Sequence, residues 1–484
     1  MERTEIIPPE VRASGFAGEE IKAEIERNTA IAAKERIKAE KKGRETLQKR
    51  LAKRKIKRPD RFIYFLYWFL MAGFIMKKYR PVIKREADIN ECKGPCFLIW
   101  NHLSRLDHAY MMAATYPKRI SIVAGYSEFF KSHLAAVFRL NRILPKKNFA
   151  ADFNGIRAIN SIIMKGGCVC MAPEGMSSIF GENQPVVAGT GRFIRHYRIP
   201  VYFGECRGQF LTSPKHWLEE RPGRTEVTLK LLFTPEQLES MTDGEVEDAL
   251  NLAFRHDDYA WGREQGIRWK MHGRAAAGLD TVIYRCPECG AEFTMRSTGD
   301  RLACEKCGFY FTVDDTYAMR PSAGETGAIR SPLDLVKEER VRVIREIREK
   351  DNFSFSFPVF LGCIPEYHLI RNKQSSELCG EGVFRIDHTG VSFSGRKYGE
   401  PFEMKLGYDE IFSPVIETET SLFAFYYKGE YYDFFPYDPR VTGKVILLTE
   451  EMHRLHVNTW KNFPWYSRMY EGLPETGDGD EAKV

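Results

Sequence analysis

The residues best suited to chemistry in this sequence lie in the stretch NHLSRLD, where His102 and Asp107 have the spacing H-x-x-x-x-D. An imidazole titrates near neutral pH and can take a proton from a substrate, and a nearby carboxylate can accept its other ring N–H. The spacing alone does not separate such a pair from a histidine that is satisfied in the core or at the surface. A second polar stretch, APEGMSS, carries Glu174 and Gly175.

Both stretches follow apolar runs that are typical of buried strands, CFLIWN at Cys96–Asn101 and CVCMAP at Cys168–Pro173. Two further runs, at Ile199–Gly208 and Thr225–Thr234, have the same character. A helical pattern at Asp152–Lys165 lies between the strands, so the class predicted is α/β with a central mixed sheet. Loops after such strands commonly carry function.

The order of four blocks makes this pattern specific. NHLSRLD is followed by the basic block FRLNRILPKKN at Phe138–Asn148, then by PEG, then by IPVYFGECRG. This succession resembles the four motifs of the glycerophospholipid acyltransferase family, whose best-known members are lysophosphatidic acid acyltransferases. The resemblance covers residues 60–235, and it implies an acyltransferase without a catalytic metal or organic cofactor.

The chemistry of acyl transfer explains the residue types in the first block. A hydroxyl must lose its proton while it attacks a thioester, so His102 is the expected general base, and Asp107 is expected to fix its tautomer and stabilise the imidazolium. The resemblance implies direct attack without an acyl-enzyme, so Ser104 is a positioning residue and not a nucleophile. His108 lacks the motif spacing. Backbone N–H groups near Gly175 are candidates for stabilising the oxyanion.

In the family, the second and third motifs hold the phosphate of the acceptor, which implies that Glu174 and Gly175 line the substrate site. The second block carries four cations that suit a phosphate monoester, the alternative being a solvated basic turn. They are Arg139, Arg142, Lys146 and Lys147. The third motif usually reads E-G-T-R-S, whereas this chain has Met176 and Ser177 in place of Thr-Arg. The missing arginine leaves open whether the acceptor carries a phosphate.

A separate group of cysteines has the spacing of a metal site, C-x2-C-x14-C-x2-C, with a glycine directly after each pair. Its members are Cys286, Cys289, Cys304 and Cys307. Two such knuckles let four thiolates meet tetrahedrally, so the pattern predicts a small β zinc ribbon with structural Zn. A redox or iron–sulfur site is the competing interpretation. The scattered spacing of the eleven cysteines is unlike a secreted disulfide framework and favours a reducing compartment.

Positive charge is concentrated in an N-terminal arm. Between Lys22 and Arg58 there are 15 Lys or Arg against 5 Glu, a local net charge of +10, although the whole chain carries only +6. The pattern indicates a largely solvated helix that could bind anionic lipid or nucleic acid, or could simply be a charged surface.

The segment that follows the arm favours lipid. Phe62–Met76 is fifteen residues without a charge, and basic residues flank it on both sides. At ~22 Å it is shorter than the ~30 Å hydrocarbon core, so we expect a helix that lies in one leaflet, with a buried helix as the alternative. No cleavage-site pattern follows it, so the expected location is the cytoplasmic face of a membrane, monotopic or peripheral.

Beyond the ribbon, an amphipathic helix capped by Ser331 precedes several short strand patterns and a helix near Thr449–Trp460. This order resembles a pleckstrin-homology-like α+β barrel or sandwich in shape. The expected domains are a basic helical arm at 1–60, a membrane-associated α/β acyltransferase domain at 61–275, the zinc ribbon at 281–316, a linker at 321–332, a helix plus PH-like β module at 333–465, and a disordered acidic tail at 471–484.

These observations predict a membrane-surface O-acyltransferase that moves an acyl chain from acyl-CoA or acyl carrier protein to a lysophospholipid. The expected acceptor is 1-acyl-sn-glycerol-3-phosphate, which would give phosphatidic acid, and no nucleic acid partner is expected. Two alternatives remain, an acyltransferase with a non-phosphate acceptor and a zinc-containing scaffold protein with an inactive acyltransferase-like domain. The intact set of His102, Asp107 and Glu174 speaks against the scaffold, and Met176-Ser177 speaks for it.

Overall fold

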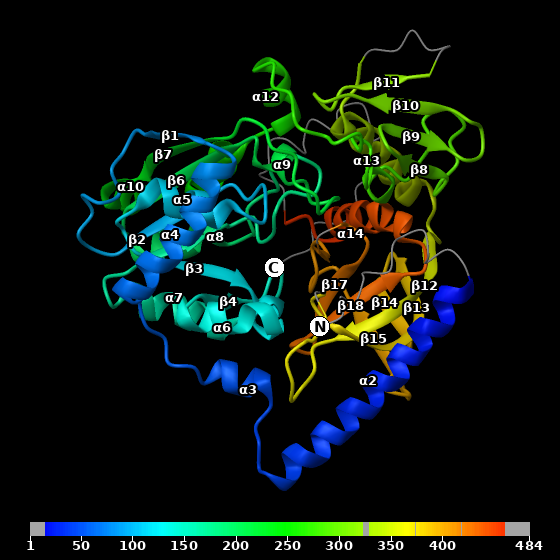
Figure 1. The fold of residues 1–484 in the computed structure, drawn as a ribbon, viewed down its shortest axis with the longest axis horizontal. Helices are drawn as coiled ribbons and strands as arrows, with labels where there is room; N and C mark the ends of the chain where they lie inside the picture. Colours follow the sequence, from blue (N-terminus) through cyan, green and yellow to red (C-terminus); the bar gives the residue numbers. More distant parts are fainter. Residues whose placement is uncertain (1–14, 323–328, 373, 418, 460–484) are drawn as a thin grey trace.

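The computed structural model describes residues 15–322, 329–372, 374–417 and 419–459, which form three β-sheets with helices packed around them (Figure 1). The predicted tail at 471–484, the first fourteen residues of the predicted arm and the end of the last predicted helix lie outside the described residues.

The first sheet has seven strands in the order β1-β7-β6-β2-β5-β3-β4. They are β1 (Val82–Arg85), β2 (Cys96–Trp100), β3 (Ile120–Gly125), β4 (Leu144–Lys146), β5 (Cys168–Met171), β6 (Val201–Arg207) and β7 (Glu226–Phe233). Strands β6 and β7 run antiparallel and the other neighbours run parallel. The predicted α/β class with a mixed sheet is therefore confirmed.

Both faces of this sheet are buried, which explains the continuous apolar runs in its strands. Along β2, Leu98 and Trp100 join one apolar cluster, whereas Phe97 and Ile99 join the other. The first face is covered by α4 (Arg61–Lys78) and α5 (Asp107–Thr115), and the second by α7 (Phe153–Ile163), α8 (Thr190–Tyr197) and α11 (Asp243–Phe254). The other helices of this part are η1 (Tyr126–Phe130), α6 (Ser132–Leu140), α9 (Gln209–Thr212), α10 (Pro235–Ser240) and α12 (Asp258–Glu264).

The parallel strands define two edges of the sheet with different residues. Because β2, β3, β4 and β5 run in one direction, the residues that follow them share the carboxyl edge, where α/β proteins commonly bind ligands. His102 follows β2 and Glu174 follows β5 at this edge. Arg119, Arg142 and Lys165 precede β3, β4 and β5, so they lie at the opposite, amino edge.

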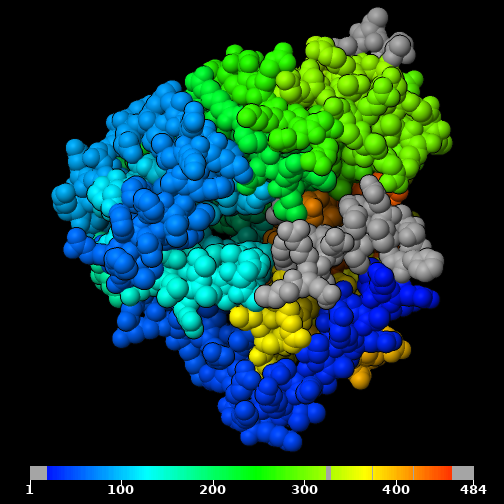
Figure 2. Space-filling model, viewed as in Figure 1, coloured from blue at the N-terminus to red at the C-terminus, as the bar shows by residue number. Residues whose placement is uncertain are grey.

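The arm consists of two helices, α2 (Gly15–Lys41) and α3 (Leu47–Ala52), that are interrupted at Gly43, where φ is +59°. Helix α2 is largely exposed, as predicted, but one of its residues, Ile21, is buried against Phe360 and Phe435 of the third sheet. Asn28 also donates a hydrogen bond to the carbonyl of Leu378 at 3.0 Å. Figure 2 shows the dark blue arm lying against the yellow-to-orange sheet on this face.

Helix α4 contains the predicted apolar segment and is buried on only one side. Asp60 caps it by accepting hydrogen bonds from the backbone N–H groups of Phe62 and Ile63. Tyr64 and Ile75 face the core, whereas 68% of Phe62 is exposed. Among the described residues, no helix combines the length and the apolar character that crossing a membrane requires.

The second and third sheets are antiparallel and separate from the first. The second has the order β11-β10-β9-β8 and consists of β8 (Met295–Thr298), β9 (Arg301–Cys304), β10 (Tyr310–Val313) and β11 (Met319–Pro321). A short helix, η2 (Leu279–Thr281), precedes it, and α13 (Pro332–Glu349) follows it. The side chain of Ser331 caps α13 as predicted, by accepting from the N–H of Asp334.

The third sheet has the order β15-β14-β13-β12-β18-β17-β16. Its strands are β12 (Ser354–Cys363), β13 (Glu377–Asp387), β14 (Gly390–Lys397), β15 (Glu400–Leu406), β16 (Val415–Ile416), β17 (Phe423–Tyr427) and β18 (Glu430–Pro436), followed by η3 (Pro439–Val441) and α14 (Thr442–His456). Helix α14 begins at Thr442 and not near Thr449 as predicted. The antiparallel module with a C-terminal helix is present, and its likeness to a pleckstrin-homology fold stays a prediction.

The third sheet meets the first domain at the carboxyl edge of the first sheet. Strands β3 and β4 point toward β17 and β18 in Figure 1. The rings of Tyr126 and Tyr426 are 6.4 Å apart, and the Lys147 ammonium donates to the carbonyl of Gly429. The C-terminal module therefore packs beside the edge that carries His102.

Candidate active site

His102 and Asp107 form a hydrogen-bonded pair at the carboxyl edge of the first sheet. Asp107 is the first residue of α5, so the turn between β2 and α5 brings the two side chains together. The Nδ1 atom of His102 lies 2.9 Å from Oδ2 of Asp107. The Asp107 side chain is fully buried, whereas 26% of the His102 side chain is exposed. The imidazole is thus held on its inner side and open to a substrate on its outer side.

The loop itself determines the orientation of Asp107. The backbone N–H groups of Leu103 and Ser104 donate to Oδ2 at 2.7 and 2.9 Å, and the Ser104 hydroxyl donates to Oδ1 at 2.6 Å. A carboxylate surrounded by donors is an acceptor only, so the ring proton of His102 resides on Nδ1. Nε2 is then the basic nitrogen, as a general base requires.

Glu174 joins the two polar stretches that the sequence singled out. One carboxylate oxygen accepts the backbone N–H of His102 at 2.5 Å, and the other accepts the N–H of Gln184 at 2.8 Å. Burial raises the pKa of Glu174 to about 8, in opposition to these two donors. Because the side chain is buried and both oxygens are used internally, Glu174 is a positioning residue for His102 and not the substrate contact that was predicted.

Gly175 is required by backbone geometry. Its φ is +83°, and a Cβ atom there would lie 2.6 Å from the ring of Phe149. Phe149 in turn packs edge-on against Phe412 of the C-terminal module, with 4.8 Å between ring centroids. The N–H of Gly175 donates to the carbonyl of Ala172 at 3.2 Å, so this N–H is engaged in the turn, and the other backbone N–H groups near Gly175 stay the predicted oxyanion donors.

Lys215 is a site residue that the sequence motifs did not reveal. Its ammonium donates to the hydroxyl of Ser177 at 3.0 Å and to the carbonyl of Ser177 at 3.3 Å. Burial lowers the pKa of Lys215 to about 8, and the nearby Glu417 carboxylate partly opposes this effect. Ser177 stands where the family motif usually has arginine, so a buried cation from a distant loop adjoins that position. The only sequence signal was the missing arginine itself.

The four basic residues predicted to bind phosphate do not converge. Arg142 is at the amino edge and donates to the carbonyl of Arg58 at 2.5 Å, whereas Arg139 is exposed on α6. Lys146 donates to the carbonyl of Lys147 at 2.7 Å, and the Lys147 ammonium lies over the rings of two tyrosines, Tyr126 and Tyr426. Placement at opposite edges of one sheet excludes Arg142 from the substrate contacts near His102.

His108 faces away from this arrangement. Its ring stacks on Tyr67 of α4, with 6.5 Å between centroids, and burial lowers its pKa. It is therefore a packing residue between α4 and α5.

The four cysteines of the predicted ribbon come together at one point. Their sulfur atoms all lie within 4.8 Å of one another, and two of the separations are 3.7 Å for Cys286–Cys307 and 3.8 Å for Cys289–Cys304. Zn–S bonds of about 2.3 Å place tetrahedral sulfurs ~3.8 Å apart, so this set fits a zinc ion. Gly290 and Gly308 close matching turns, with φ of +70° and +78°.

Comparison with known proteins found one family model that covers the site. The family model described as Acyltransferase matches residues 78–202, which include both polar stretches of the site. The crystal structure of the 1-acyl-sn-glycerophosphate (LPA) acyltransferase PlsC from Thermotoga maritima aligns with a TM-score of 0.33 and 13% identity, over 42% of this chain and 81% of that one. No curated protein matches the sequence.

The matched residues contain β2 to β5 and the His102–Asp107 pair, so this α/β domain is an acyltransferase domain. This part of the chain is similar to the acyltransferases that the family model describes, and the chain is accordingly an acyltransferase.

Proposed function

We propose that this protein is a membrane-surface O-acyltransferase that moves an acyl chain from acyl-CoA or acyl carrier protein to the hydroxyl of 1-acyl-sn-glycerol-3-phosphate, giving phosphatidic acid. The observation that carries the proposal is the His102–Asp107 hydrogen bond of 2.9 Å at the carboxyl edge of the acyltransferase domain.

In the proposed mechanism, Nε2 of His102 takes the proton of the acceptor hydroxyl as its oxygen attacks the thioester carbonyl. The buried Asp107 carboxylate stabilises the imidazolium that forms. When the tetrahedral intermediate collapses, the carbon–sulfur bond breaks and the imidazolium returns the proton to the thiolate. The products are the new ester and a free thiol, and no group of the enzyme is acylated.

Lys215 is the cation best placed to hold an acceptor phosphate. It adjoins Ser177, and the next residue, Ser178, donates its backbone N–H to the carbonyl of His102 at 2.6 Å. The ammonium of Lys215 is buried, and its hydrogen bonds among the described residues go to neutral groups of Ser177. Only the nearby Glu417 carboxylate opposes the effect of burial on its pKa, so it can take an anionic partner. The alternative, an acyltransferase with a non-phosphate acceptor, is favoured by the absence of the usual arginine at this position.

Membrane attachment through α4 is part of the proposal. One side of the helix packs on the domain, where Trp68 stacks on Tyr116 at 3.8 Å, and the other side exposes large apolar residues. The exposed residues are Phe62, Phe65, Leu66, Phe69, Leu70, Phe74 and Met76. This geometry suits a helix that lies in one leaflet at the cytoplasmic face.

Membrane attachment could be tested by deleting residues 1–80, but that deletion would also remove the side of α4 that packs on the domain. Substituting exposed residues of α4 tests the membrane contact without this damage. The triple variant F62S/F69S/L70S should lose vesicle binding and keep its thermal midpoint, since all three residues are exposed. Equal binding of the variant and the wild type would place the membrane contact elsewhere.

The catalytic proposal is tested with a histidine pair. His102→Gln should abolish acyl transfer, whereas the matched variant His108→Gln should retain it, because His108 packs against α4. The assay offers acyl-CoA and acyl carrier protein donors with lysophosphatidic acid and lysophosphatidylcholine. Full activity of His102→Gln would refute the mechanism, and inactivity of the wild type with every pair would favour a scaffold.

We also propose that the four cysteines hold one structural zinc ion. Four thiolates leave no open coordination position, so the ion would stabilise the second sheet without taking part in acyl transfer. Elemental analysis of protein purified without chelators should find about one zinc per chain. Cys304→Ser should lose the metal, and a chain without zinc that folds equally well would contradict the assignment.

A further inference from the structure

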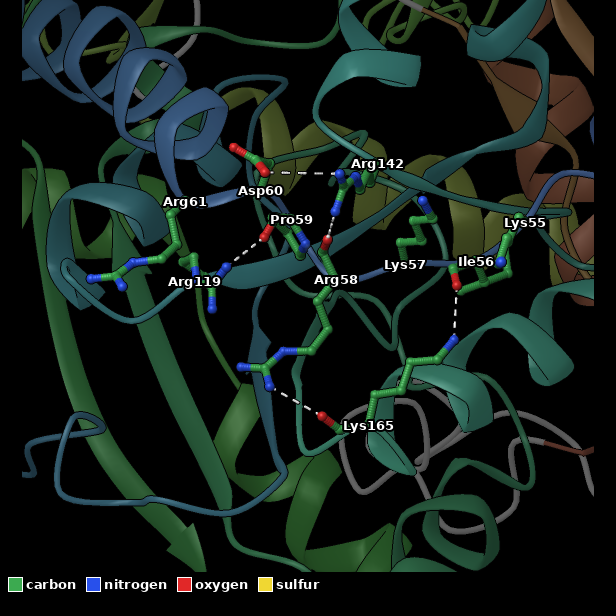
Figure 3. Close-up of a pocket in the computed structure, with 10 residues that line it drawn as sticks. All are labelled: Lys55, Ile56, Lys57, Arg58, Pro59, Asp60, Arg61, Arg119, Arg142 and Lys165. Atoms are coloured by element: carbon green, nitrogen blue, oxygen red, sulfur yellow. Dashed lines mark hydrogen bonds and ion pairs between the residues drawn. The ribbon is translucent and has the colours of Figure 1, made fainter.

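A basic cavity of about 520 Å³ lies at the amino edge of the first sheet, next to the start of α4. Seven of its ten lining residues are Lys or Arg, and one, Asp60, is acidic. The cations come from the end of the arm, from α4 and from the loops that precede β3, β4 and β5 (Figure 3). A net positive charge thus gathers in one concave site.

This cavity is distinct from the active site. Arg119 precedes β3 and Arg142 precedes β4, whereas His102 follows β2. Since these strands run in one direction, the cavity and the catalytic pair lie at opposite edges of the sheet. The cations at the amino edge therefore take no part in the acyl-transfer chemistry.

Backbone carbonyls hold these cations in place without neutralising them. Arg119 donates to the carbonyl of Pro59 at 2.8 Å, and Lys165 donates to that of Ile56 at 2.8 Å. Arg58 donates to the carbonyl of Lys165 at 3.0 Å, and Figure 3 shows these contacts as dashed lines. A carbonyl oxygen carries only a partial charge, so the positions are fixed while most of the positive charge remains.

The single carboxylate in the lining is already engaged. Asp60 caps α4 by accepting from the N–H groups of Phe62 and Ile63, and its other oxygen is 3.9 Å from Arg142. Burial, and then repulsion from Arg58, Arg61 and Arg142, lower the pKa of Arg119. The positive charge of the cavity is therefore complementary to a ligand that carries several negative charges.

The position of the cavity relative to α4 indicates which anion it serves. Arg61 lines the cavity and is also the first residue of α4, and Phe62, the next residue, is 68% exposed. The exposed apolar face of the helix therefore starts at the rim of the cavity. In a bilayer, interfacial aromatic side chains lie at the level of the lipid headgroups, so the start of α4 and the cavity beside it would meet the same layer.

We propose that this cavity binds the phosphate headgroup of an anionic phospholipid while α4 lies in the same leaflet. The site would select anionic membranes and would orient the acyltransferase domain on them. This proposal rests on the membrane attachment proposed above. It concerns binding to the membrane and is tested without measuring catalysis.

The test uses the full chain and two matched pairs of surface cations. Lys57 and Arg61 line the cavity and are exposed, and neither makes a hydrogen bond or ion pair within the described part of the chain. Lys41 and Lys42 are exposed on the arm, outside the cavity. Affinity is measured for vesicles of phosphatidylcholine alone and of phosphatidylcholine with phosphatidylglycerol. K57Q/R61Q should weaken binding to the anionic vesicles by about tenfold or more, and K41Q/K42Q by much less.

Several outcomes would overturn the proposal. Equal losses in the two double variants would indicate diffuse attraction by the arm, with no specific site. If titration with inorganic phosphate showed binding that K57Q/R61Q abolishes, while vesicle affinity stayed unchanged, the ligand would be a soluble phosphate. His102→Gln should bind vesicles like the wild type, so failure of the catalytic proposal would be seen separately from failure of this one.

Discussion

Replacing Asp107 by asparagine separates the charge of this residue from its hydrogen bonds. Oδ2 of Asp107 accepts from the N–H groups of Leu103 and Ser104 as well as from Nδ1 of His102. An asparagine amide placed with its NH2 group at this position would face two backbone donors. We therefore expect its oxygen to take the Oδ2 position, with the NH2 group donating to the hydroxyl of Ser104.

This orientation keeps the Nδ1–H tautomer of His102 and removes only the negative charge. A hydrogen bond to a charged partner contributes about 1.5–3 kcal/mol, compared with about 0.5–1.5 kcal/mol for a neutral one. The loss of stabilisation of the imidazolium is then ~1–2 kcal/mol, which lowers kcat/KM by about fivefold to thirtyfold. Acyl transfer is followed by release of the free thiol, and the free energy of unfolding is measured by denaturant titration.

Asp107→Ala provides the contrast, because it leaves the two N–H groups and the Ser104 hydroxyl without their acceptor in a buried loop. Each such group costs about 1–3 kcal/mol, so this variant should be strongly destabilised as well as inactive. If Asp107→Asn were folded like the wild type but as inactive as His102→Gln, the ring would have changed tautomer and the reasoning would be refuted. Full activity would equally show that the charge has no role.

Three further predictions concern other contacts. Gly175→Ala should lower the free energy of unfolding by more than the ~1–2 kcal/mol that a left-handed backbone costs a residue with a Cβ, because the new Cβ would meet the ring of Phe149. Gly43→Ala is the control, because Gly43 has φ +59° but lies in open space. Equal losses of stability in the two variants would contradict the contact with Phe149. Lys215 loses its charge as pH rises through its pKa of about 8, so the KM of the wild type for lysophosphatidic acid should increase above that pH. In Lys215→Met this KM should be high at every pH. A KM of the wild type that does not change with pH would argue against phosphate binding by Lys215. Arg340→Met should lower the free energy of unfolding, measured by denaturant titration, by about 3–5 kcal/mol. The reason is that Glu450 and Glu451 would stay buried without the arginine that contacts them at 2.6 and 2.7 Å. A variant as stable as the wild type would show that these two ion pairs contribute nothing.

The fold was predictable where the pattern was local. The runs at β2, β5, β6 and β7 are apolar because both faces of the sheet are covered, and such runs are visible in one dimension. Strand β12 is harder to predict from the sequence, because Pro358 interrupts its apolar pattern. In the structure this proline pairs only with β13, and the pairing with β18 begins at Val359, so the missing N–H is not needed.

The arm shows a different limit of sequence reasoning. Its charge and its helix-forming residues were correctly interpreted as a helix, but docking of Ile21 on the third sheet depends on residues more than three hundred positions away. Composition records how polar a helix is and does not record what surface another part of the chain offers it. The break at Gly43 likewise becomes visible only from its backbone conformation.

The sequence by itself identified the His102–Asp107 pair, because these two residues are close along the chain and their spacing can be recognised in the linear sequence. The same is true of each cysteine knuckle. Only the tertiary structure decided which cations share a site. It placed Arg142 at the amino edge and Lys215 beside Ser177, since the direction of the strands determines which loops meet. The attraction between charges depends on their distance in space, and the separation of two residues along the chain does not reveal that distance.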